Sequence, residues 1–149
     1  MPAWEGSSES AWFRLGGVAL VAVGVTSAIA ALPVLAFGFL VSGGALLLLE
    51  RVEVRVDEHG LQAANRWGWP RVRFPLDEIE AATAIDVRPG QWGGWGYRGS
   101  VSLFHRAAWV LHRGPGIKLD LTRSRVFVVA VDDAEAGAAA LQARLTRLG

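Results

Sequence analysis

A continuous stretch of uncharged side chains runs from Leu15 to Leu49 and constrains the fold of this chain more than any other feature. An apolar stretch of about 18 or more residues is a candidate membrane span, because a charged side chain at the centre of a bilayer costs roughly 2.5–3.5 kcal/mol. The stretch accounts for much of the 52% hydrophobic content of the 149-residue chain. We therefore expect an integral membrane protein with a domain attached to the membrane.

The length of the stretch predicts two short spans. One straight span needs about 20 residues. Pro33 lies near the middle of the stretch, where it removes a backbone donor and clashes with the preceding helical turn. The sequence therefore predicts a transmembrane helical hairpin with helices over about residues 11–31 and 34–49, preceded by an amino-terminal tail over residues 1–10. The alternative is a single long helix that is kinked or tilted.

The composition of the two helices fits a packed pair in lipid. Two sets of small residues recur at helical spacing: Gly17, Gly24 and Ala28 in the first helix, and Gly38, Ser42 and Ala45 in the second. Such ridges let helix backbones approach closely, although a chain rich in alanine and glycine also produces these spacings by chance. Trp12 and Phe13 lie at the start of the first helix, where an interfacial aromatic belt is expected.

Charged residues beside the stretch predict its orientation. Arg14 precedes the first helix and Arg51 follows the second, whereas the connecting turn has no basic residue. Because basic residues are retained on the cytoplasmic side, we expect a multi-pass protein of the cell (inner) membrane with both termini in the cytoplasm. A cleaved signal peptide ending near residues 28–30 is the alternative. The acidic Glu5 and Glu9 count against it, since a signal peptide begins with a basic region.

The overall composition excludes several classes of protein. There is no cysteine, so the chain has no disulfide, no thiol catalysis and no thiolate metal site. The formal net charge is only +1, which does not indicate a nucleic-acid-binding surface. Nearly all basic residues are arginine, with Lys118 the only lysine, a composition typical of bacteria with GC-rich genomes.

Residues 50–149 are predicted to form one small domain of six or seven strands and a final helix. Apolar alternation and short β-branched runs indicate strands near residues 52–56, 61–63, 71–74, 79–87, 108–111, 117–121 and 125–131. Gly114-Pro115-Gly116 lies between two of these strands and predicts a hairpin that joins them.

The final helix is predicted from a single apolar face. Its members are Ala134, Ala138, Leu141, Leu145 and Leu148. They recur at steps of four and three, and Asp132 or Asp133 is placed to cap the helix amino terminus. Strands closed by one carboxyl-terminal helix indicate the α+β class, with the helix covering the sheet.

Three short runs carry a resemblance to a known family. They are Trp92–Arg98 (Trp-Gly-Gly-Trp-Gly-Tyr-Arg), Arg113–Gly116 and Val128–Ala134. Together with the two spans, they resemble membrane-anchored bacterial pleckstrin-homology-like (PH-like) proteins, especially those of actinobacteria. The resemblance implies a bent antiparallel sheet, or partial barrel, closed at one end by the helix, and it implies no agreed activity. PH domains that bind phosphoinositides usually carry a basic cluster between their first two strands, whereas the corresponding turn here, Asp57–Gly60, is acidic.

The Trp-Gly run is the first candidate binding site. Its glycines permit left-handed backbone, and its aromatic rings offer large amphipathic faces. A binding loop would use Trp92, Trp95, Tyr97 and Arg98 as its contacts. In one alternative the loop folds back on the sheet and seals the core, and in another its tryptophans insert into the bilayer interface. The glycines also match the G-x-G-x-x-G spacing of dinucleotide-binding loops, but no helix is predicted after them.

Arg66, Arg71 and Arg73 are the second candidate site. They would form a basic face toward anionic lipid headgroups, at about 1 kcal/mol per residue near the surface. The alternative is an ordinary solvated strand face. The three histidines lack metal-ligand spacing and no catalytic motif is present, so we expect no metal, no cofactor and no enzymatic activity.

These features predict a non-catalytic binding or scaffold module at the membrane. It would present a PH-like domain to a protein partner or to the membrane surface. The alternative is a small structural subunit of a larger membrane complex, held by the glycine and alanine ridges.

Overall fold

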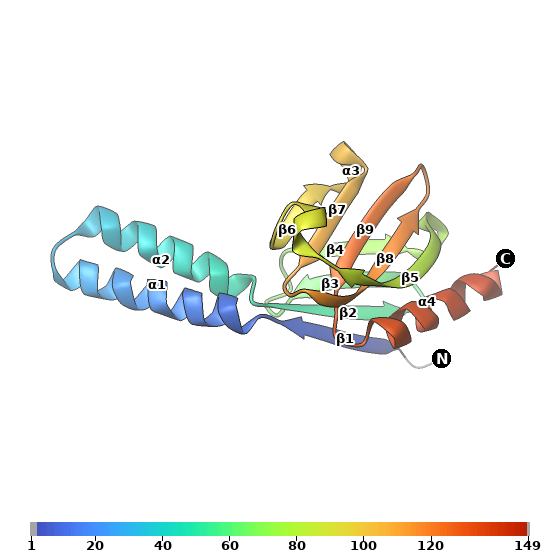
Figure 1. The fold of residues 1–149 in the computed structure, drawn as a ribbon, viewed down its shortest axis with the longest axis horizontal. Coiled ribbons are helices and arrows are strands. Elements are labelled where there is room, and N and C mark those ends of the chain that lie inside the picture. Colours follow the sequence, from blue (N-terminus) through green and yellow to red (C-terminus); the bar gives the residue numbers. More distant parts are fainter. Residues whose placement is uncertain (1–2, 149) are drawn as a thin grey trace.

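The computed structural model describes residues 3–148, with side chains as far as Arg147, and shows a pair of apolar helices joined to a β-rich domain (Figure 1). The class is α+β, as predicted. The helices are α1 (Ala11–Ile29), α2 (Pro33–Leu48), α3 (Val101–Phe104) and α4 (Ala134–Leu148), with 3₁₀ turns η1 (Leu76–Glu78) and η2 (Pro89–Trp92). The strands are β1 (Trp4–Glu9), β2 (Arg51–Asp57), β3 (Gly60–Asn65), β4 (Arg71–Pro75), β5 (Ile79–Val87), β6 (Gly96–Ser100), β7 (Arg106–Val110), β8 (Gly114–Leu121) and β9 (Arg125–Ala130).

The uncharged stretch forms two helices that run side by side in opposite directions (Figure 1). α2 begins at Pro33. Proline is favoured at the first helical position, because a backbone N–H there would have no partner within the helix and its absence costs nothing. The break expected near Pro33 is therefore confirmed, and a single long helix is wrong. By length and composition α1, with 19 residues, is long and apolar enough to cross a membrane, whereas α2 is a shorter apolar helix of 16 residues.

The two helices meet along glycines, although only part of the predicted contact is present. Gly17 and Gly24 are buried on α1, as predicted, whereas Ala28 is exposed. On α2 the buried residues are Ala36 and Gly43. A Cβ atom on Gly43 would lie 2.8 Å from the carbonyl oxygen of Gly17, so the backbones touch there. The predicted ridge of Gly38, Ser42 and Ala45 is wrong because it faces outward; every face of α2 has small residues, so their spacing did not identify the contact.

Residues 4–9, expected to be part of a tail, form strand β1. β1 pairs antiparallel with β2 along its whole length, from Trp4 opposite Val56 to Glu9 opposite Arg51. The backbone N–H of Ser10 donates to the carbonyl of Glu50 at 2.9 Å. The helix pair is therefore an insertion between the two strands of the first hairpin. The domain also includes β1, which the expected boundaries of residues 1–10 and 50–149 had separated from it.

The strands form two sheets. The first has the order β1-β2-β3-β4, and the second has the order β5-β8-β9-β7-β6. In β2, buried valines alternate with exposed Glu53 and Arg55, which confirms the alternation predicted for this strand. β6 is a strand that the sequence does not predict, because its residues, Gly96–Ser100, include two glycines and show no apolar alternation.

The hairpin predicted across Gly114-Pro115-Gly116 is wrong. β9 lies between β7 and β8, pairing parallel with β7 and antiparallel with β8. β8 and β9 form the hairpin instead, through a turn in which Arg123 and Ser124 have φ angles of 63° and 56°. The expected all-antiparallel sheet is therefore only mostly antiparallel. Gly114, Pro115 and Gly116 are the first residues of β8, and the chain bends before them, at residues 111–113. A local signal does not show which strand inserts between its neighbours.

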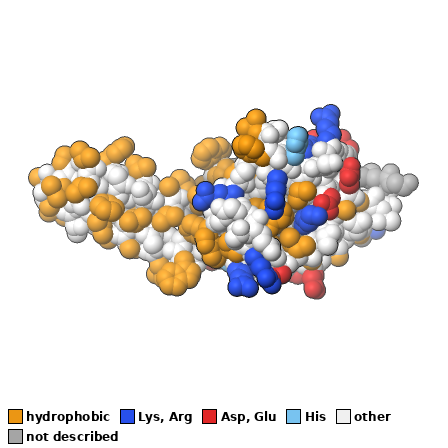
Figure 2. Space-filling model, turned by 45° about the horizontal axis from the view of Figure 1, so that its top comes forward, with side chains coloured by type: hydrophobic (Ala, Val, Ile, Leu, Met, Phe, Trp, Pro, Cys, Tyr) orange, Lys and Arg blue, Asp and Glu red, His pale blue; other side chains and the backbone are white. Residues whose placement is uncertain are grey.

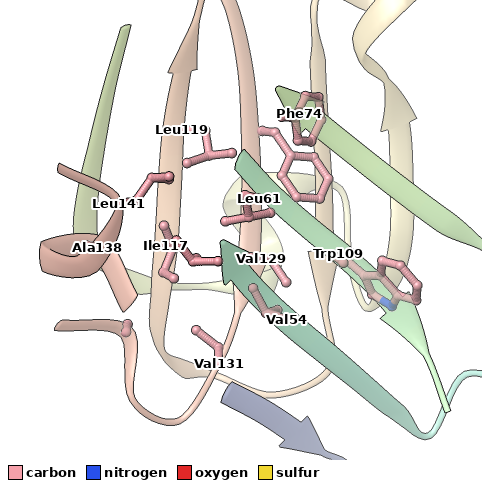
Figure 3. Close-up of a cluster of buried hydrophobic side chains, with 14 of the residues drawn as sticks. Val54, Leu61, Phe74, Trp109, Ile117, Leu119, Val129, Val131, Ala138 and Leu141 are labelled. Carbon is pink, nitrogen blue, oxygen red and sulfur yellow. The ribbon is translucent and has the colours of Figure 1, made fainter. Parts of the chain in front are cut away.

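The main core lies between the two sheets. Figure 3 shows Val54 and Leu61 of the first sheet pointing toward Ile117 and Val129 of the second. Trp109 on β7 is the largest fully buried side chain in the described part of the chain. Burial of these side chains supplies the hydrophobic stabilisation that holds the sheets face to face.

α4 closes one side of this core, where it packs against β5, β8, β1 and β2. Asp133 directly precedes the helix, and its carbonyl accepts from the N–H of Gly137 at 3.2 Å. The predicted face of Ala134, Ala138 and Leu141 is buried, which confirms the periodicity. Leu148, also expected on this face, lies outside the described side chains.

Candidate functional site

The Trp-Gly run lies between β5 and β6 and folds back over the outer face of the five-stranded sheet. Gly93, Gly94 and Gly96 have φ angles of 84°, 114° and 84°, a left-handed region that residues with a Cβ atom rarely adopt. These glycines let the chain reverse over the sheet. The run leads into β6 and the single turn α3, which is not the strand-turn-helix setting of a dinucleotide-binding loop.

Trp92 covers a second, smaller core. The half-buried ring packs on a cluster of Val87, Ala108, Val110 and Val128, on the face of the sheet opposite the main core. The guanidinium carbon of Arg106 lies 4.1 Å from the ring centroid, a cation–π contact. Arg106 also donates from Nη2 to the carbonyl of Gln91 at 3.1 Å. These contacts fit the alternative in which this part of the loop seals the sheet.

Trp95 lies elsewhere, at the junction between the domain and the helix pair. It lines an open cavity of about 540 Å³ whose walls are mainly apolar. The other walls include Trp12 and Phe13 from the start of α1, Leu46 from the end of α2, and Leu111. Half of the Trp95 side chain is exposed. The loop therefore brings an aromatic ring to the level at which both apolar helices join the domain.

Tyr97 and Arg98 continue from Trp95 into β6. The ring of Tyr97 meets the buried ring of Trp109 edge-on, with centroids 5.7 Å apart and an interplanar angle of 89°. Partial burial raises the pKa of the Tyr97 phenol above its ordinary value of 10.0, because removal from water disfavours the phenolate. Arg98 donates from Nε to the carbonyl of Trp95 at 3.1 Å, which holds the loop closed.

Arg66, Arg71 and Arg73 lie on the four-stranded sheet. Arg71 and Arg73 alternate outward on the edge strand β4, and Arg66 precedes it in the β3–β4 turn. All three are exposed, and none forms an ion pair within the described part of the chain. The three arginines do not form one site with the Trp-Gly run, which leads into β6 of the five-stranded sheet. The seven predicted site residues therefore lie in more than one place.

The junction contains a further feature, the turn Trp67-Gly68-Trp69-Pro70 between β3 and β4. Trp67 and Trp69 are 72% and 75% exposed. The carbonyl oxygen of the Asn65 side chain accepts from the backbone N–H groups of Trp67 and Trp69, at 3.0 and 2.9 Å. The sequence carried one signal for this feature: Trp67 and Trp69 flank a glycine and lie between Arg66 and Arg71. A turn that only connects two strands does not need two large aromatic side chains.

The same asparagine joins this turn to the helix pair. Asn65 is 2% exposed, and its Nδ2 atom donates to the carbonyl of Leu48 at 2.8 Å. Leu48 is the last residue of α2, where helix carbonyls lack intrahelical partners. One side chain therefore satisfies a helix carboxyl terminus and shapes the β3–β4 turn, so the turn is fixed at the level where the second apolar helix ends.

The junction also contains one close pair of ionisable side chains. His112, on the cavity wall, lies with Nε2 3.1 Å from Oδ1 of Asp132. Within residues 3–148 no group of three or more histidine, aspartate or glutamate side chains is arranged to hold a metal ion. The arrangement offers exposed aromatic rings, an apolar hollow and guanidinium groups, which are chemical features of an amphipathic contact surface.

The fold and the junction define the chain as an α+β protein in which an apolar helix pair is inserted into a two-sheet domain. In comparisons with known proteins, no family model, no curated protein and no solved structure matches it.

Proposed function

We propose that this chain is a membrane-anchored, non-catalytic binding module that uses its helix pair to hold a PH-like domain at the membrane surface. The observation that carries the proposal is the exposure of the helix pair. The helices contact one another along buried glycines, and many of their large apolar side chains are exposed, as on the face of the pair seen in Figure 2. The exposed set includes Leu15, Val18, Val23, Val25, Ile29, Val34, Leu35, Phe37, Leu40 and Val41. Contiguous apolar surface of this extent is typical of contact with lipid.

The pairing of β1 with β2 supports a two-span anchor. Because the two strands are joined by the Ser10–Glu50 hydrogen bond, the chain on each side of the helix pair must lie on the same side of a bilayer. An even number of crossings satisfies this requirement. A signal peptide cleaved near residue 30 would remove β1 from the sheet, so the pairing favours the uncleaved chain. The arginines beside the helices favour the cytoplasmic side for the domain.

The domain side of the junction supports a role in binding. The Trp95 cavity and the exposed aromatic rings around it lie next to the anchor, where a protein partner or the membrane surface can reach them. The acidic Asp57–Gly60 turn argues against a phosphoinositide pocket at that position, in agreement with a PH-like module that uses another surface.

Single-cysteine mapping tests the anchor and its orientation. The chain has no cysteine, so each introduced thiol gives a signal without background. We expect Leu32→Cys, between the helices, to react with a membrane-impermeant maleimide added outside intact bacterial spheroplasts. Glu58→Cys, in the β2–β3 turn, serves as the matched control and should react only after lysis. Equal labelling of both positions in intact cells, or recovery of the protein in the soluble fraction, would contradict the proposal.

A further inference from the structure

The β3–β4 turn is a rigid element with an apolar tip. Besides the two hydrogen bonds to the Asn65 side chain, the N–H of Gly68 donates to the carbonyl of Asn65 at 2.9 Å. The turn is thus closed by its own backbone and by a buried amide, while the rings of Trp67 and Trp69 project into the surroundings. Such a rigid display of two large apolar rings has no function in the described fold, where neither ring belongs to a core cluster.

The position of this turn indicates what covers it. The Asn65–Leu48 hydrogen bond holds it beside the end of α2, and the Ser10–Glu50 bond brings the start of α1 to the same level. Trp12, at that start, is 86% exposed. Three exposed tryptophans therefore lie where the apolar helices give way to the polar domain. Tryptophan concentrates at this depth because its ring is amphipathic and suits the headgroup region.

The charge around the turn adds a second, independent indication. Between residues 65 and 75 the chain carries Arg66, Arg71 and Arg73 and no acidic residue. All three guanidinium groups are exposed and free of ion pairs among the described residues. A basic segment beside a membrane anchor complements the anionic lipids of a cytoplasmic leaflet, and each basic residue near the surface contributes about 1 kcal/mol.

We infer that the β3–β4 turn is a second membrane contact, which inserts Trp67 and Trp69 into the headgroup layer of an anionic bilayer. Arg66 and Arg71 flank the tip and bind lipid phosphate groups. The contact seats the four-stranded sheet against the membrane and fixes the orientation of the domain. The inference rests on the proposed function, because it takes the helix pair to be the anchor.

Quenching by brominated lipid tests the contact in the full-length protein. The protein is reconstituted in phosphatidylcholine–phosphatidylglycerol vesicles whose acyl chains carry bromine near the headgroup. Four tryptophans are exposed in the described chain, namely Trp12, Trp67, Trp69 and Trp95. We therefore expect the double variant W67F/W69F to lose about half of the quenchable emission. The matched control W4F removes a partly buried ring that packs against Gly137 at the other end of β1, and it should leave the quenchable emission unchanged.

The variant W12F separates the inference from the proposed function. If W12F lowers the quenchable emission and W67F/W69F does not, the anchor stands, and the turn faces water or a protein partner, which overturns the inference. If neither variant lowers it, the helix pair does not reach the bilayer, and the proposed function fails as well. Phenylalanine at two exposed positions leaves the core intact, and an unchanged circular dichroism spectrum verifies this.

A charge series tests the lipid preference. In the parent protein, raising the phosphatidylglycerol fraction should increase quenching of Trp67 and Trp69. The variant R66Q/R71Q should lose this increase, whereas R147Q, at the far end of α4, should keep it. An increase that persists in R66Q/R71Q would overturn the assignment of these arginines to lipid phosphates.

Discussion

Asn65 shows how one buried amide determines the geometry of a junction. Its oxygen accepts two backbone N–H groups of the β3–β4 turn, and its nitrogen donates to the last residue of α2. A side chain without both an acceptor and a donor cannot satisfy all three partners. The position of the turn relative to the helix pair therefore depends on this residue.

We predict that Asn65→Ala destabilises the protein by roughly 1–3 kcal/mol, because the variant leaves partly buried backbone groups without their side-chain partner. Asn65→Asp keeps the acceptor for the backbone N–H groups of Trp67 and Trp69, but it places a carboxylate oxygen against the carbonyl oxygen of Leu48 at a buried position, so we expect it to destabilise the protein as well. Denaturant unfolding of the detergent-solubilised protein measures both. Gln62→Ala on the same strand is the control. Equal stability of Asn65→Ala and Gln62→Ala would contradict this role.

Tyr97 offers a direct measurement of burial, because it is the only tyrosine in the chain. Its raised pKa means that the folded state disfavours the phenolate. The unfolded chain therefore ionises first, and this contribution to stability is complete below about pH 10 and is lost as pH rises through the folded pKa. We predict a tyrosinate absorbance midpoint above 10 in the native protein and near 10 in denaturant. A native midpoint at or below the denatured one would be inconsistent with the packing on Trp109.

The sequence identified the residues of the Trp-Gly run, but it did not predict that their side chains lie in different environments. Trp92 seals a core, Trp95 lines the junction, and Tyr97 packs on Trp109. The burial of each ring depends on β7 and on the helix pair, which are distant in sequence. Asn65 was missed because its role depends on Leu48, which no local pattern connects to it.

At the scale of elements, the helix pair depends on a close backbone contact. The contact between Gly17 and Gly43 leaves no room for a side chain, whereas the neighbouring Gly44 has open space around it. Local pattern was sufficient to predict where these helices begin and end, as well as most strands. Local pattern did not predict which face of α2 packs against α1, nor that β9 pairs with β7. Both depend on contacts with segments that are distant in the sequence.

We predict that Gly43→Leu destabilises the helix pair by about 1–3 kcal/mol, since the new side chain meets the backbone of α1. Gly44→Leu changes the same residue type one position away and should have little effect. Thermal unfolding in detergent, followed by helical circular dichroism, compares the two. A larger loss for Gly44→Leu would show that the helices pack on a different face.

At the scale of the whole molecule, the helix pair is an insertion from which Phe13, near the start of α1, packs against the main core. The buried residues of the main core come from both sheets and α4. The helix pair is joined to the domain at Ser10 and Glu50, which are hydrogen-bonded to each other. The pattern of apolar residues along the chain predicted the α+β class and the two apolar helices. The inclusion of β1 in the domain was not predictable, because Trp4–Glu9 has no apolar alternation and is a strand only by virtue of its pairing with β2.

We predict that replacing residues 11–49 by Asn-Gly gives a soluble, folded domain, since these two residues favour the tight turn needed between Ser10 and Glu50. A fragment of residues 50–149 should instead aggregate or unfold at lower temperature, because the loss of β1 exposes the edge of β2. Size-exclusion chromatography compares the aggregation of the joined domain and the fragment, and thermal unfolding compares their stability. A fragment as stable as the joined domain would show that β1 contributes nothing.

The interruption of the first hairpin also has a consequence for biosynthesis. The ribosome completes β1 before the helices exist, and its partner β2 emerges only after both of them. If only one of the two helices crossed a bilayer, β1 and β2 would lie on opposite sides of it. The two strands could not pair, and the four-stranded sheet would remain incomplete. Correct insertion thus becomes a precondition for completing the domain, and the unpaired edge of a misinserted chain would mark it for degradation.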